Sequence, residues 1–454
     1  MTVHEIDPRL RGALLRPGDR GYDEGRAAWN RNAHQEPAAV VMAEGAGDVV
    51  AGVRFARAEG LGVAVMATGH GTSIPCDGGV LINTSRMSGV RVAGRTRIAR
   101  VGAGAKWADL APVAAEHGLA GLPGSGSRVG IVGYTMGGGF GWLGRRYGLA
   151  SGSVTAADVV TADGRLVRAD PFGHADLLWG LRGGGGNFGI VTALEFALHP
   201  VVRVYGGNLL YPVERAGEVL AAYAAWADEQ PDEMASAVAF RRFPPLPTVP
   251  EPLRGRLLMA VRSCWSGADP TDGERRVDVL RAALGRPEVD TCAVLPVTAL
   301  DTISSDPVDP IGFLGHCELV PDLTPAAIGA LVELGSASPL IALELRRLGG
   351  ALSAPAAQLS PMGRTGARYS LNAIGVTSTP DAVGPIQDYL ARLAAAMRPH
   401  VTGGTYLNFL DLNGATPHRV RAAYSAADWQ RLVELKRRWD PDNVFRFNRN
   451  IPPR

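Results

Sequence analysis

The sequence has few cysteines and no long apolar run. Its four cysteines, at positions 76, 264, 292 and 317, are far apart and form no Cys-x-x-Cys pair, so we expect neither a zinc site nor a disulfide framework. A membrane-spanning helix needs about 18 or more apolar residues in succession, and no such run occurs. The first residues are charged and lack the apolar core of a secretory signal. The sequence therefore predicts a cytoplasmic protein without a bound metal.

An excess of charge of one sign is also missing. Lys and Arg number 46, Asp and Glu number 44, and the formal net charge is +2. Binding to a nucleic acid or to an anionic membrane depends on a basic surface, so this balance argues against both partners and favours a small molecule. The sequence has no Gly-x-x-x-x-Gly-Lys-[Ser/Thr] loop, which argues against a P-loop nucleotidase. Nothing in it indicates an oligomeric state.

Glycine is abundant, with 58 of the 454 residues, about one residue in eight against a typical usage of about 7%. Three clusters stand out, at residues 67–72, 124–141 and 183–189. Glycine lets the backbone adopt positive φ and lets N–H groups converge on an anion without a Cβ in the way. Together the clusters could hold a diphosphate, whereas any one of them alone is more typical of a tight turn.

Hydrophobic periodicity predicts a chain of mixed α and β structure. Residues 39–67 have the pattern of a strand, a helix and a second strand, and the helix is indicated by Val49, Val53 and Ala56 at spacings of four and three. Asp163-Gly164 lies between two short apolar runs as in a hairpin. After residue 201, expected helices alternate with expected strands. The helices are expected at 216–229, 272–284, 324–334 and 426–439, and the strands at 235–243, 256–261 and 367–376. In the third of these helices Thr324 is expected to be the N-cap and Pro325 the first helical residue.

Several longer motifs follow one another along the chain. They are Thr68-Gly69-His70, Gly130-Ile131-Val132-Gly133 with the glycines of 137–141, Arg146-Tyr147-Gly148-Leu149, residues 176–189, Tyr406-Leu407-Asn408-Phe409, and residues 439–448. In this order they resemble the berberine-bridge-enzyme-like FAD-linked oxidases of the vanillyl-alcohol-oxidase superfamily, over nearly the whole chain. The Phe-Arg-x-Asn-x-Asn-Ile pattern at 445–451 is most similar to that of bacterial members.

The resemblance implies an α+β fold in three parts. Residues 1–200 would form an FAD-binding domain of the PCMH type. Residues 201–400 would form a substrate domain with an antiparallel sheet covered by helices. Residues 401–454 would form a C-terminal segment that returns to the FAD domain.

The resemblance also implies FAD, bound covalently through one histidine. In the family the histidine of the first glycine loop is bonded to the 8α carbon of the flavin, and by position this residue is His70. Many relatives have a second bond to a cysteine, but Gly126 occupies that position here, so the second bond is expected to be absent. The other implied FAD-binding residues are Thr68, Gly69, Gly71, Thr72, Val129, Gly130, Gly133, Gly137, Gly138, Gly139, Gly141, Gly189, Ile190, Tyr406, Asn408 and Asn448.

The implied reaction is removal of a hydride from a small molecule to flavin N5, with return of the electrons to O2 and formation of hydrogen peroxide. The expected substrate is an alcohol, an amine or a phenolic natural product of bacterial secondary metabolism. Val129 occupies the position thought to control access of oxygen, and valine favours the oxidase type. Two alternatives stay open: a flavin dehydrogenase, reductase or oxidative cyclase that does not rely on O2, and a carrier protein without catalysis.

Three residues are candidates for the base that takes the substrate's proton: Tyr406, Glu344 and Tyr134. An unperturbed tyrosine has a pKa near about 10, so it needs a cation or a flavin dipole to act as a base at neutral pH. Each candidate also has a structural interpretation. Tyr406 and Asn408 could only bind the flavin edge, Tyr134 could only pack, and Glu344 could form an ion pair with Arg346 or Arg347.

Overall fold

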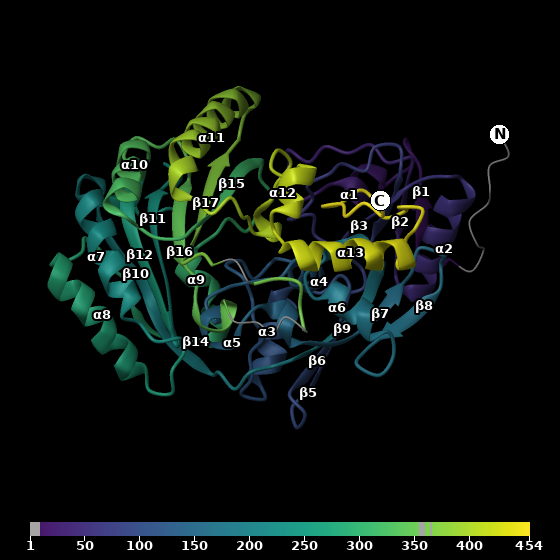
Figure 1. Cartoon of the computed structure of the whole chain (residues 1–454), viewed down its shortest axis with the longest axis horizontal. Helices are drawn as coiled ribbons and strands as arrows, with labels where there is room; N and C mark the ends of the chain where they lie inside the picture. Colours follow the sequence, from purple (N-terminus) through teal and green to yellow (C-terminus); the bar gives the residue numbers. More distant parts are fainter. Residues whose placement is uncertain (1–9, 354–358, 364–365) are drawn as a thin grey trace.

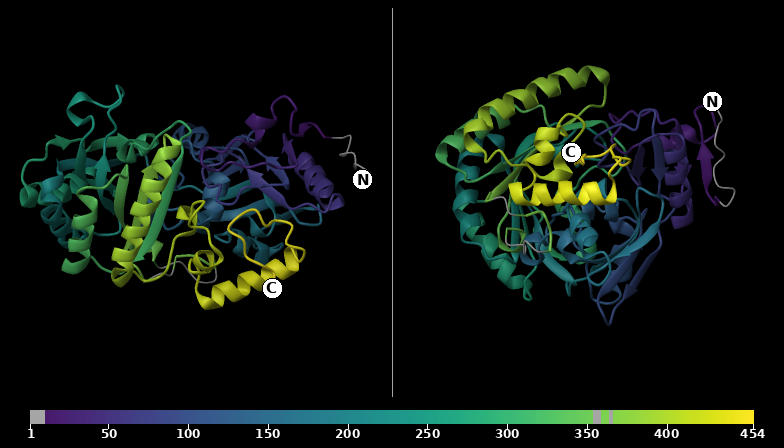
Figure 2. Two further views of the ribbon diagram at one scale, coloured as in Figure 1. Left: turned by 90° about the horizontal axis from the view of Figure 1, so that it is seen from above. Right: turned by 45° about the vertical axis from the view of Figure 1, so that its right-hand side comes forward.

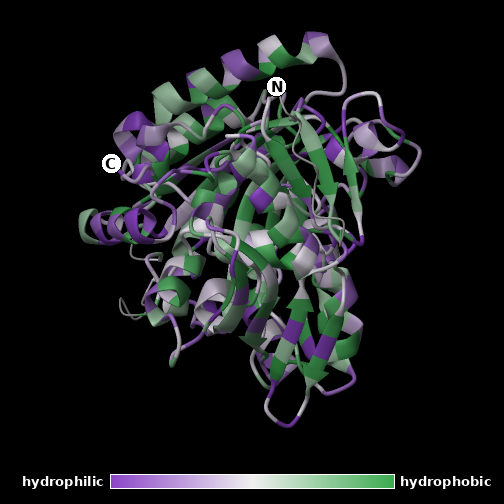
Figure 3. Cartoon of the chain, turned by 90° about the vertical axis from the view of Figure 1, so that its right-hand side faces the viewer, coloured by the Kyte–Doolittle hydropathy of each residue, from purple (hydrophilic) through white to green (hydrophobic). Residues whose placement is uncertain are grey.

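Three β-sheets organise the part of the chain that the computed structural model describes, residues 10–353, 359–363 and 366–454. Two smaller sheets lie in the N-terminal half and one larger sheet in the middle of the chain (Figure 1). The C-terminal residues, yellow in Figures 1 and 2, run back along the N-terminal half. In Figure 3 most residues of the strands are green and therefore hydrophobic. The expected α+β fold class is confirmed.

The first sheet combines parallel strands with a helical crossover. Its order is β1 (Ala13–Leu15), β2 (Ala39–Met42), β4 (Val80–Asn83) and β3 (Val63–Met66), and β4 pairs in parallel with both β2 and β3. Helix α2 (Ala46–Ala58) connects β2 to β3 and buries Val49, Val53 and Ala56 in a shared core. These are the residues whose spacing predicted a helix, and that prediction is confirmed. The first glycine loop follows directly after β3.

The second sheet is antiparallel throughout. Its order is β5 (Val90–Ala93), β6 (Ile98–Gly102), β9 (Ile190–Ala197), β7 (Val154–Val160) and β8 (Leu166–Ala169). The predicted hairpin at Asp163-Gly164 is confirmed, since it joins β7 to β8 and Gly164 has φ +74°. A common core joins this sheet to α3 (Trp107–Ala115), α4 (Ile131–Met136) and α6 (Ala175–Leu181).

The large sheet has eight strands, all in antiparallel pairs. Its order is β13 (Val289–Asp290), β10 (Arg203–Pro212), β12 (Leu257–Trp265), β11 (Met234–Arg242), β16 (Ala342–Arg347), β17 (Tyr369–Val376) and β15 (Phe313–Val320), with β14 (Ala293–Pro296) also paired to β10. Four helices cover one face of it (Figure 1): α7 (Ala216–Asp228), α8 (Pro270–Leu284), α10 (Pro325–Gly335) and α11 (Val383–Met397).

Alternation along the strands gives this sheet two different faces. On β11, Val238 and Phe240 belong to the core under the helices, whereas Ala237 and Arg241 point to the opposite face. The helix-covered face is therefore apolar. The other face turns toward the N-terminal half and is free to carry charged side chains.

The expected helices are present with small shifts of their ends. Helix α10 begins after Thr324, whose hydroxyl accepts from the Ala327 N–H, with Pro325 at its first position as predicted. Helix α11 and the strands β10, β15 and β16 were not predicted from the sequence. The remaining α-helices are α1 (Tyr22–Arg26), α5 (Gly144–Tyr147), α9 (Asp301–Ser304), α12 (Pro417–Arg421) and α13 (Ala426–Trp439). None of the helices in the described part of the chain has the length and hydropathy of a membrane span.

The C-terminal segment packs against the N-terminal half. Leu435 of α13 lies so close to Gly180 of α6 that a Cβ there would come within 2.2 Å of it. The ammonium of Lys436, which is fully buried, donates to the carbonyl oxygens of Asn187 and Phe445 at 2.9 and 3.0 Å and to the Asp440 carboxylate at 2.7 Å. The division of the chain at residues 200 and 400 stays a prediction.

Replacement of Lys436 by methionine is expected to lower the free energy of unfolding by about 3–5 kcal/mol, because it leaves the buried Asp440 carboxylate without its cation. Two backbone N–H groups, of Val444 and Phe445, still donate to Asp440, but they carry no full charge. Urea unfolding measures the change. The control is Lys106→Met, because Lys106 is exposed. Equal effects of the two replacements would contradict the prediction.

Candidate active site

Two large cavities adjoin between the N-terminal half and the large sheet. The first, here called the glycine-lined cavity, measures about 340 Å³ and is lined by the first glycine loop, residues 129–137, residues 185–191 and the C-terminal tail. The second, here called the sheet-side cavity, measures about 470 Å³ and reaches the face of the large sheet that is opposite the helices. The residues that line both are His70, Gly71, Thr72, Ser125, Val129, Arg346, Asn408, Phe409 and Arg449.

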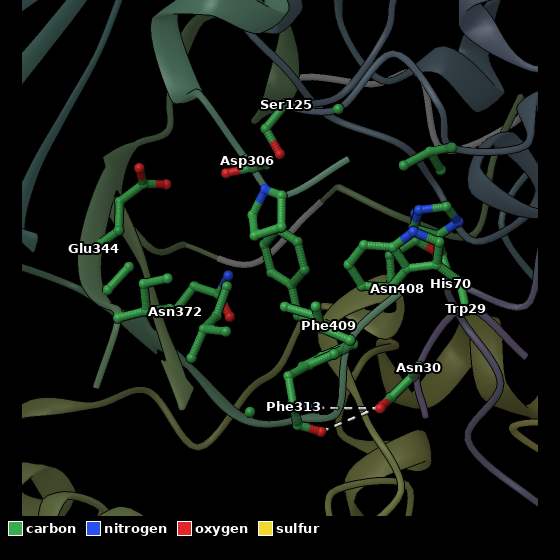
Figure 4. Close-up of a pocket in the computed structure, with 18 of the residues that line it drawn as sticks. Trp29, Asn30, His70, Ser125, Asp306, Phe313, Glu344, Asn372, Asn408 and Phe409 are labelled. Carbon is green, nitrogen blue, oxygen red and sulfur yellow. Dashed lines mark hydrogen bonds between the residues drawn. The ribbon is translucent and has the colours of Figure 1, made fainter. Parts of the chain in front are cut away.

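His70 lies at the junction of the two cavities. The preceding Gly69 has φ +77°, and a Cβ on it would come within 2.6 Å of Ala28 Cα, so only glycine fits the turn. The His70 ring stacks on Trp29 with centroids 4.4 Å apart (Figure 4), and its Nδ1 lies 2.9 Å from the Thr68 hydroxyl. Burial, and then the charge of Lys106, lower the pKa of His70 to about 4. The imidazole is therefore neutral at neutral pH and keeps a nucleophilic nitrogen.

Three buried polar atoms in the glycine-lined cavity have no hydrogen-bond partner among the described residues. They are the hydroxyls of Tyr134 and Tyr406 and the side-chain oxygen of Asn448. A buried polar group without a partner costs about 1–3 kcal/mol, so these atoms suit a polar ligand. Together with the glycine backbone of two loops, they make the cavity a fit for FAD.

The glycines of residues 137–141 serve mainly close packing. A Cβ on Gly137 would come within 1.7 Å of the Asn408 side-chain oxygen, and one on Gly141 within 1.9 Å of the Pro123 carbonyl oxygen. Asn408 also donates to the Tyr134 carbonyl at 2.8 Å. Gly137 therefore lets the C-terminal segment approach α4, and Gly141 lets its own backbone approach that of Pro123.

Most of the predicted FAD-binding residues line the glycine-lined cavity. They are Thr68, Gly69, His70, Gly71, Thr72, Val129, Gly130, Gly133, Gly137, Gly189, Tyr406, Asn408 and Asn448. The structure places Gly138, Gly139, Gly141 and Ile190 outside the lining of both cavities. Ile190 is buried in the core of the first sheet.

Arg449, which was not predicted from the sequence, connects the C-terminal tail to the first glycine loop. Its guanidinium donates to the Gly71 carbonyl at 3.2 Å and to the Leu410 carbonyl at 3.1 Å. Burial lowers its pKa to about 10, so it stays a cation at neutral pH. Arg449 stands at an unspecified position of the C-terminal pattern, and no sequence signal marked it.

The three candidate bases lie in different cavities. Tyr406 and Tyr134 line only the glycine-lined cavity, whereas Glu344 lines only the sheet-side cavity. Burial raises the pKa of both tyrosines above the ordinary value, so each keeps its proton at neutral pH. Burial alone would raise the pKa of Glu344 too, but Arg346 and Arg262 outweigh it and lower the pKa. Glu344 is thus the ionised member of the three.

The sheet holds Glu344 between two arginines. Arg346 is two residues further along β16, on the same face, and its Nη2 lies 2.8 Å from one carboxylate oxygen. Arg262 reaches the other oxygen from β12, across the small Ala237 of β11. Arg346 also lies over the Trp142 ring at 4.6 Å. The predicted ion pair of Glu344 with Arg346 is confirmed, while Arg347 pairs with Asp228 instead, at 3.2 Å.

Other side chains line the sheet-side cavity between Glu344, with its two arginines, and His70. Asn372 of β17 is the direct neighbour of Glu344 in the sheet. Figure 4 shows Glu344 and Asn372 on one side of the sheet-side cavity, His70 and Trp29 on the other, and Phe409 and Phe313 between them. The cavity therefore offers an apolar middle with a charged wall at one end and the His70 loop at the other.

Residues 10–353, 359–363 and 366–454 contain no group of three or more His, Cys, Asp or Glu side chains that could hold a metal ion. Cys76 follows the His70 loop, but it is buried in an apolar cluster and burial raises the pKa of its thiol to about 12. The thiol is therefore protonated and poorly reactive at neutral pH.

Two family profiles match segments of the chain that contribute residues to the glycine-lined cavity. A family profile described as FAD binding domain matches residues 37–170, and one described as berberine and berberine like matches residues 405–452. The first segment contains the His70 loop and the glycines of 130–141. The second contains the C-terminal residues that close the cavity around Tyr406 and Arg449.

Full-length relatives are similar at moderate identity. The (R)-6-hydroxynicotine oxidase of Paenarthrobacter nicotinovorans is 28% identical over 459 residues, which cover 98% of this chain and 97% of that protein. An FAD-linked oxidoreductase of Dictyostelium discoideum is 28% identical over 462 residues, covering 99% of this chain and 97% of that protein. The crystal structure of 6-hydroxy-D-nicotine oxidase from Arthrobacter nicotinovorans has a TM-score of 0.86 at 25% identity, covering 98% of each chain.

Proposed function

Because this chain is an FAD-linked oxidoreductase of the berberine-bridge-enzyme-like family, we propose that it oxidises a small molecule in the sheet-side cavity while FAD fills the glycine-lined cavity. The observation that carries the proposal is the position of His70, which lines both cavities. FAD bound there supplies an acceptor for a hydride from a carbon that bears oxygen or nitrogen. The proposed substrate is an alcohol, an amine or a phenolic natural product of bacterial secondary metabolism.

We propose that the FAD is held by one covalent bond, to His70. The neutral imidazole, oriented by Thr68 and Trp29, supports this assignment. Gly126 has no side chain to form a second bond, and the buried Cys76 thiol is protonated at neutral pH. Val129, Gly130 and Tyr406 would contact the cofactor from the cavity wall.

Among the three candidate bases, we assign the acceptance of the substrate's proton to Glu344. It is ionised, it lines the sheet-side cavity, and the proton of a hydroxyl or amine there can move to its carboxylate. Tyr406 and Tyr134 keep their protons, and we assign them to hydrogen-bond donation in the glycine-lined cavity. Arg262 and Arg346 fix the orientation of the carboxylate.

We propose O2 as the electron acceptor because Val129, a residue with a small side chain, lines both cavities. The alternative function is that of a dehydrogenase, reductase or oxidative cyclase that does not rely on O2. A dehydrogenase or oxidative cyclase of this kind would bind the substrate and take its proton with the same residues, and would differ from an oxidase in the acceptor that receives the electrons of the reduced flavin. A reductase would instead return a hydride and a proton to its substrate.

The experiment uses the purified holoprotein and air. The bound flavin is reduced with dithionite under nitrogen, and the protein is then mixed with air-saturated buffer. Rapid reoxidation with stoichiometric hydrogen peroxide is expected of an oxidase. Slow reoxidation would support the alternative function. A purified chain that shows no flavin absorbance, even after incubation with FAD, would overturn both.

A further inference from the structure

On the face of the large sheet opposite the helices, strands β11, β12 and β16 contribute more positive than negative side chains to the sheet-side cavity. Arg241, Arg262 and Arg346 line the cavity from three neighbouring strands, and Glu344 is the one carboxylate among them on these strands. Small residues separate the charges, since Ala239 lies opposite Glu344 and Ala342 lies opposite Arg241. In this part of the sheet the long cationic side chains therefore have small alanine side chains as neighbours.

Arg241 differs from the other two arginines in having no counter-ion. Arg262 and Arg346 both pair with Glu344. Arg241 donates one hydrogen bond, to the Ser305 carbonyl at 3.1 Å, and forms no ion pair with any residue that the structure describes. Its exposed fraction is only 9%. Burial, and then the charge of Arg262, lower its pKa to about 10, which still leaves a cation at neutral pH.

A buried cation without a partner is costly for the folded protein. The nearby carboxylates are those of Asp306 and Glu344, and both act on Arg241 only from beyond ion-pair distance. Even with both counted, the three arginines leave one positive charge in excess on this wall. The remaining N–H donors of Arg241 are thus available to an anion in the cavity.

We propose that Arg241 binds a carboxylate of the substrate that is oxidised in the sheet-side cavity, an inference that rests on the proposed function. A guanidinium is planar and can donate two parallel hydrogen bonds to a carboxylate, which sets the orientation of the ligand as well as its affinity. The substrate class is therefore narrowed to small molecules that carry a carboxylate in addition to the oxidised alcohol, amine or phenol. Arg241 is a specificity-determining residue, distinct from the proton acceptor Glu344.

The next residue along β11 supplies a matched control. Arg242 points to the opposite face of the sheet, donates to the Ser338 carbonyl at 2.7 Å, and lines neither cavity. Arg241→Gln and Arg242→Gln therefore remove the same charge from neighbouring positions of one strand. Only the first of them removes it from the sheet-side cavity.

Benzoate and benzamide serve as probes of the same shape that differ in charge. Each is titrated into the oxidised holoprotein, and the change in the visible flavin spectrum gives its dissociation constant. Arg241→Gln is expected to weaken benzoate binding about 10- to 100-fold and to leave benzamide binding within about two-fold. Arg241→Lys, which keeps the charge but not the planar fork, is expected to fall between. Arg242→Gln is expected to change neither constant.

Other results separate the possible failures. If the holoprotein contains flavin but binds benzoate no better than benzamide, the inference about the carboxylate is overturned and the proposed function stands. Equal weakening of both ligands in Arg241→Gln, together with a lower midpoint of thermal unfolding, would assign Arg241 a structural role and also overturn the inference. A chain that never acquires flavin overturns the proposed function itself.

Discussion

Replacement of His70 by alanine is expected to abolish covalent attachment of the flavin completely. The parent protein, precipitated with acid, should give a yellow pellet, and the variant a colourless pellet with free FAD in the supernatant. The reason is that His70 is the nucleophilic side chain at the junction of the cavities, while Gly126 and the buried, protonated Cys76 offer no second point of attachment. The flavin absorbance of the pellet and of the supernatant measures the fractions of covalently bound and free flavin.

The folded variant is still expected to hold FAD without a bond. The unpartnered polar atoms of Tyr134, Tyr406 and Asn448 are unaffected by the replacement. His199→Ala is the matched control, because burial, and then the charge of Arg146, lower the pKa of His199 to about 4 as well, yet this residue lines neither cavity. A yellow pellet from His70→Ala, or a colourless one from the control, would contradict the assignment.

Local signals in the sequence were sufficient for much of the fold. Thr324 with Pro325 marked the start of α10, and the spacing of Val49, Val53 and Ala56 marked α2. Helix α11 was missed although a similar spacing was present in Ile386, Leu390 and Leu393, which the structure buries. Strand β16 was also missed, because it has only six residues and three of them, Glu344, Arg346 and Arg347, are charged although most of the strand is buried.

The candidate site was less predictable because its contacts join distant parts of the chain. The pairing of Glu344 with Arg346 could be foreseen, since alternate residues of a strand share a face. The pairing with Arg262 depends on the order β12-β11-β16, which periodicity does not determine. The lack of a counter-ion at Arg241 likewise depends on how the strands assemble. The same holds for the placement of Glu344 in one cavity and of Tyr134 and Tyr406 in the other.

Replacement of Glu344 by glutamine is expected to slow reduction of the flavin by substrate about 10²- to 10⁴-fold, the range that general base catalysis commonly contributes. The amide keeps the shape of the side chain but cannot accept the proton of a hydroxyl or amine. Anaerobic stopped-flow spectroscopy of the flavin measures this step apart from reoxidation. The carbonyl of glutamine can still accept from only one of the two arginines.

The pH profile separates a catalytic role from a structural one. The folded-state pKa of Glu344 lies below the ordinary value, which is about 4.3 for glutamate. Its ionised form, and the stability that it contributes, are therefore fully present above that value and are lost only as the pH falls through the lower folded-state pKa. The rate of flavin reduction in the parent protein should therefore fall as the pH drops through this range, and the rate in Glu344→Gln should not.

Glu318→Gln is the matched control for the loss of a buried carboxylate. Glu318 has the same exposed fraction of 7% as Glu344, it is paired with Arg419 at 2.9 Å, and it lines neither cavity. Both variants leave an arginine without its full partner, Arg262 or Arg346 in one and the half-buried Arg419 in the other, so both should unfold more easily. Only Glu344→Gln should lose the fast reduction step. If both variants slow reduction equally, the role of Glu344 is to support the sheet, and the proton acceptor must be sought elsewhere in the sheet-side cavity.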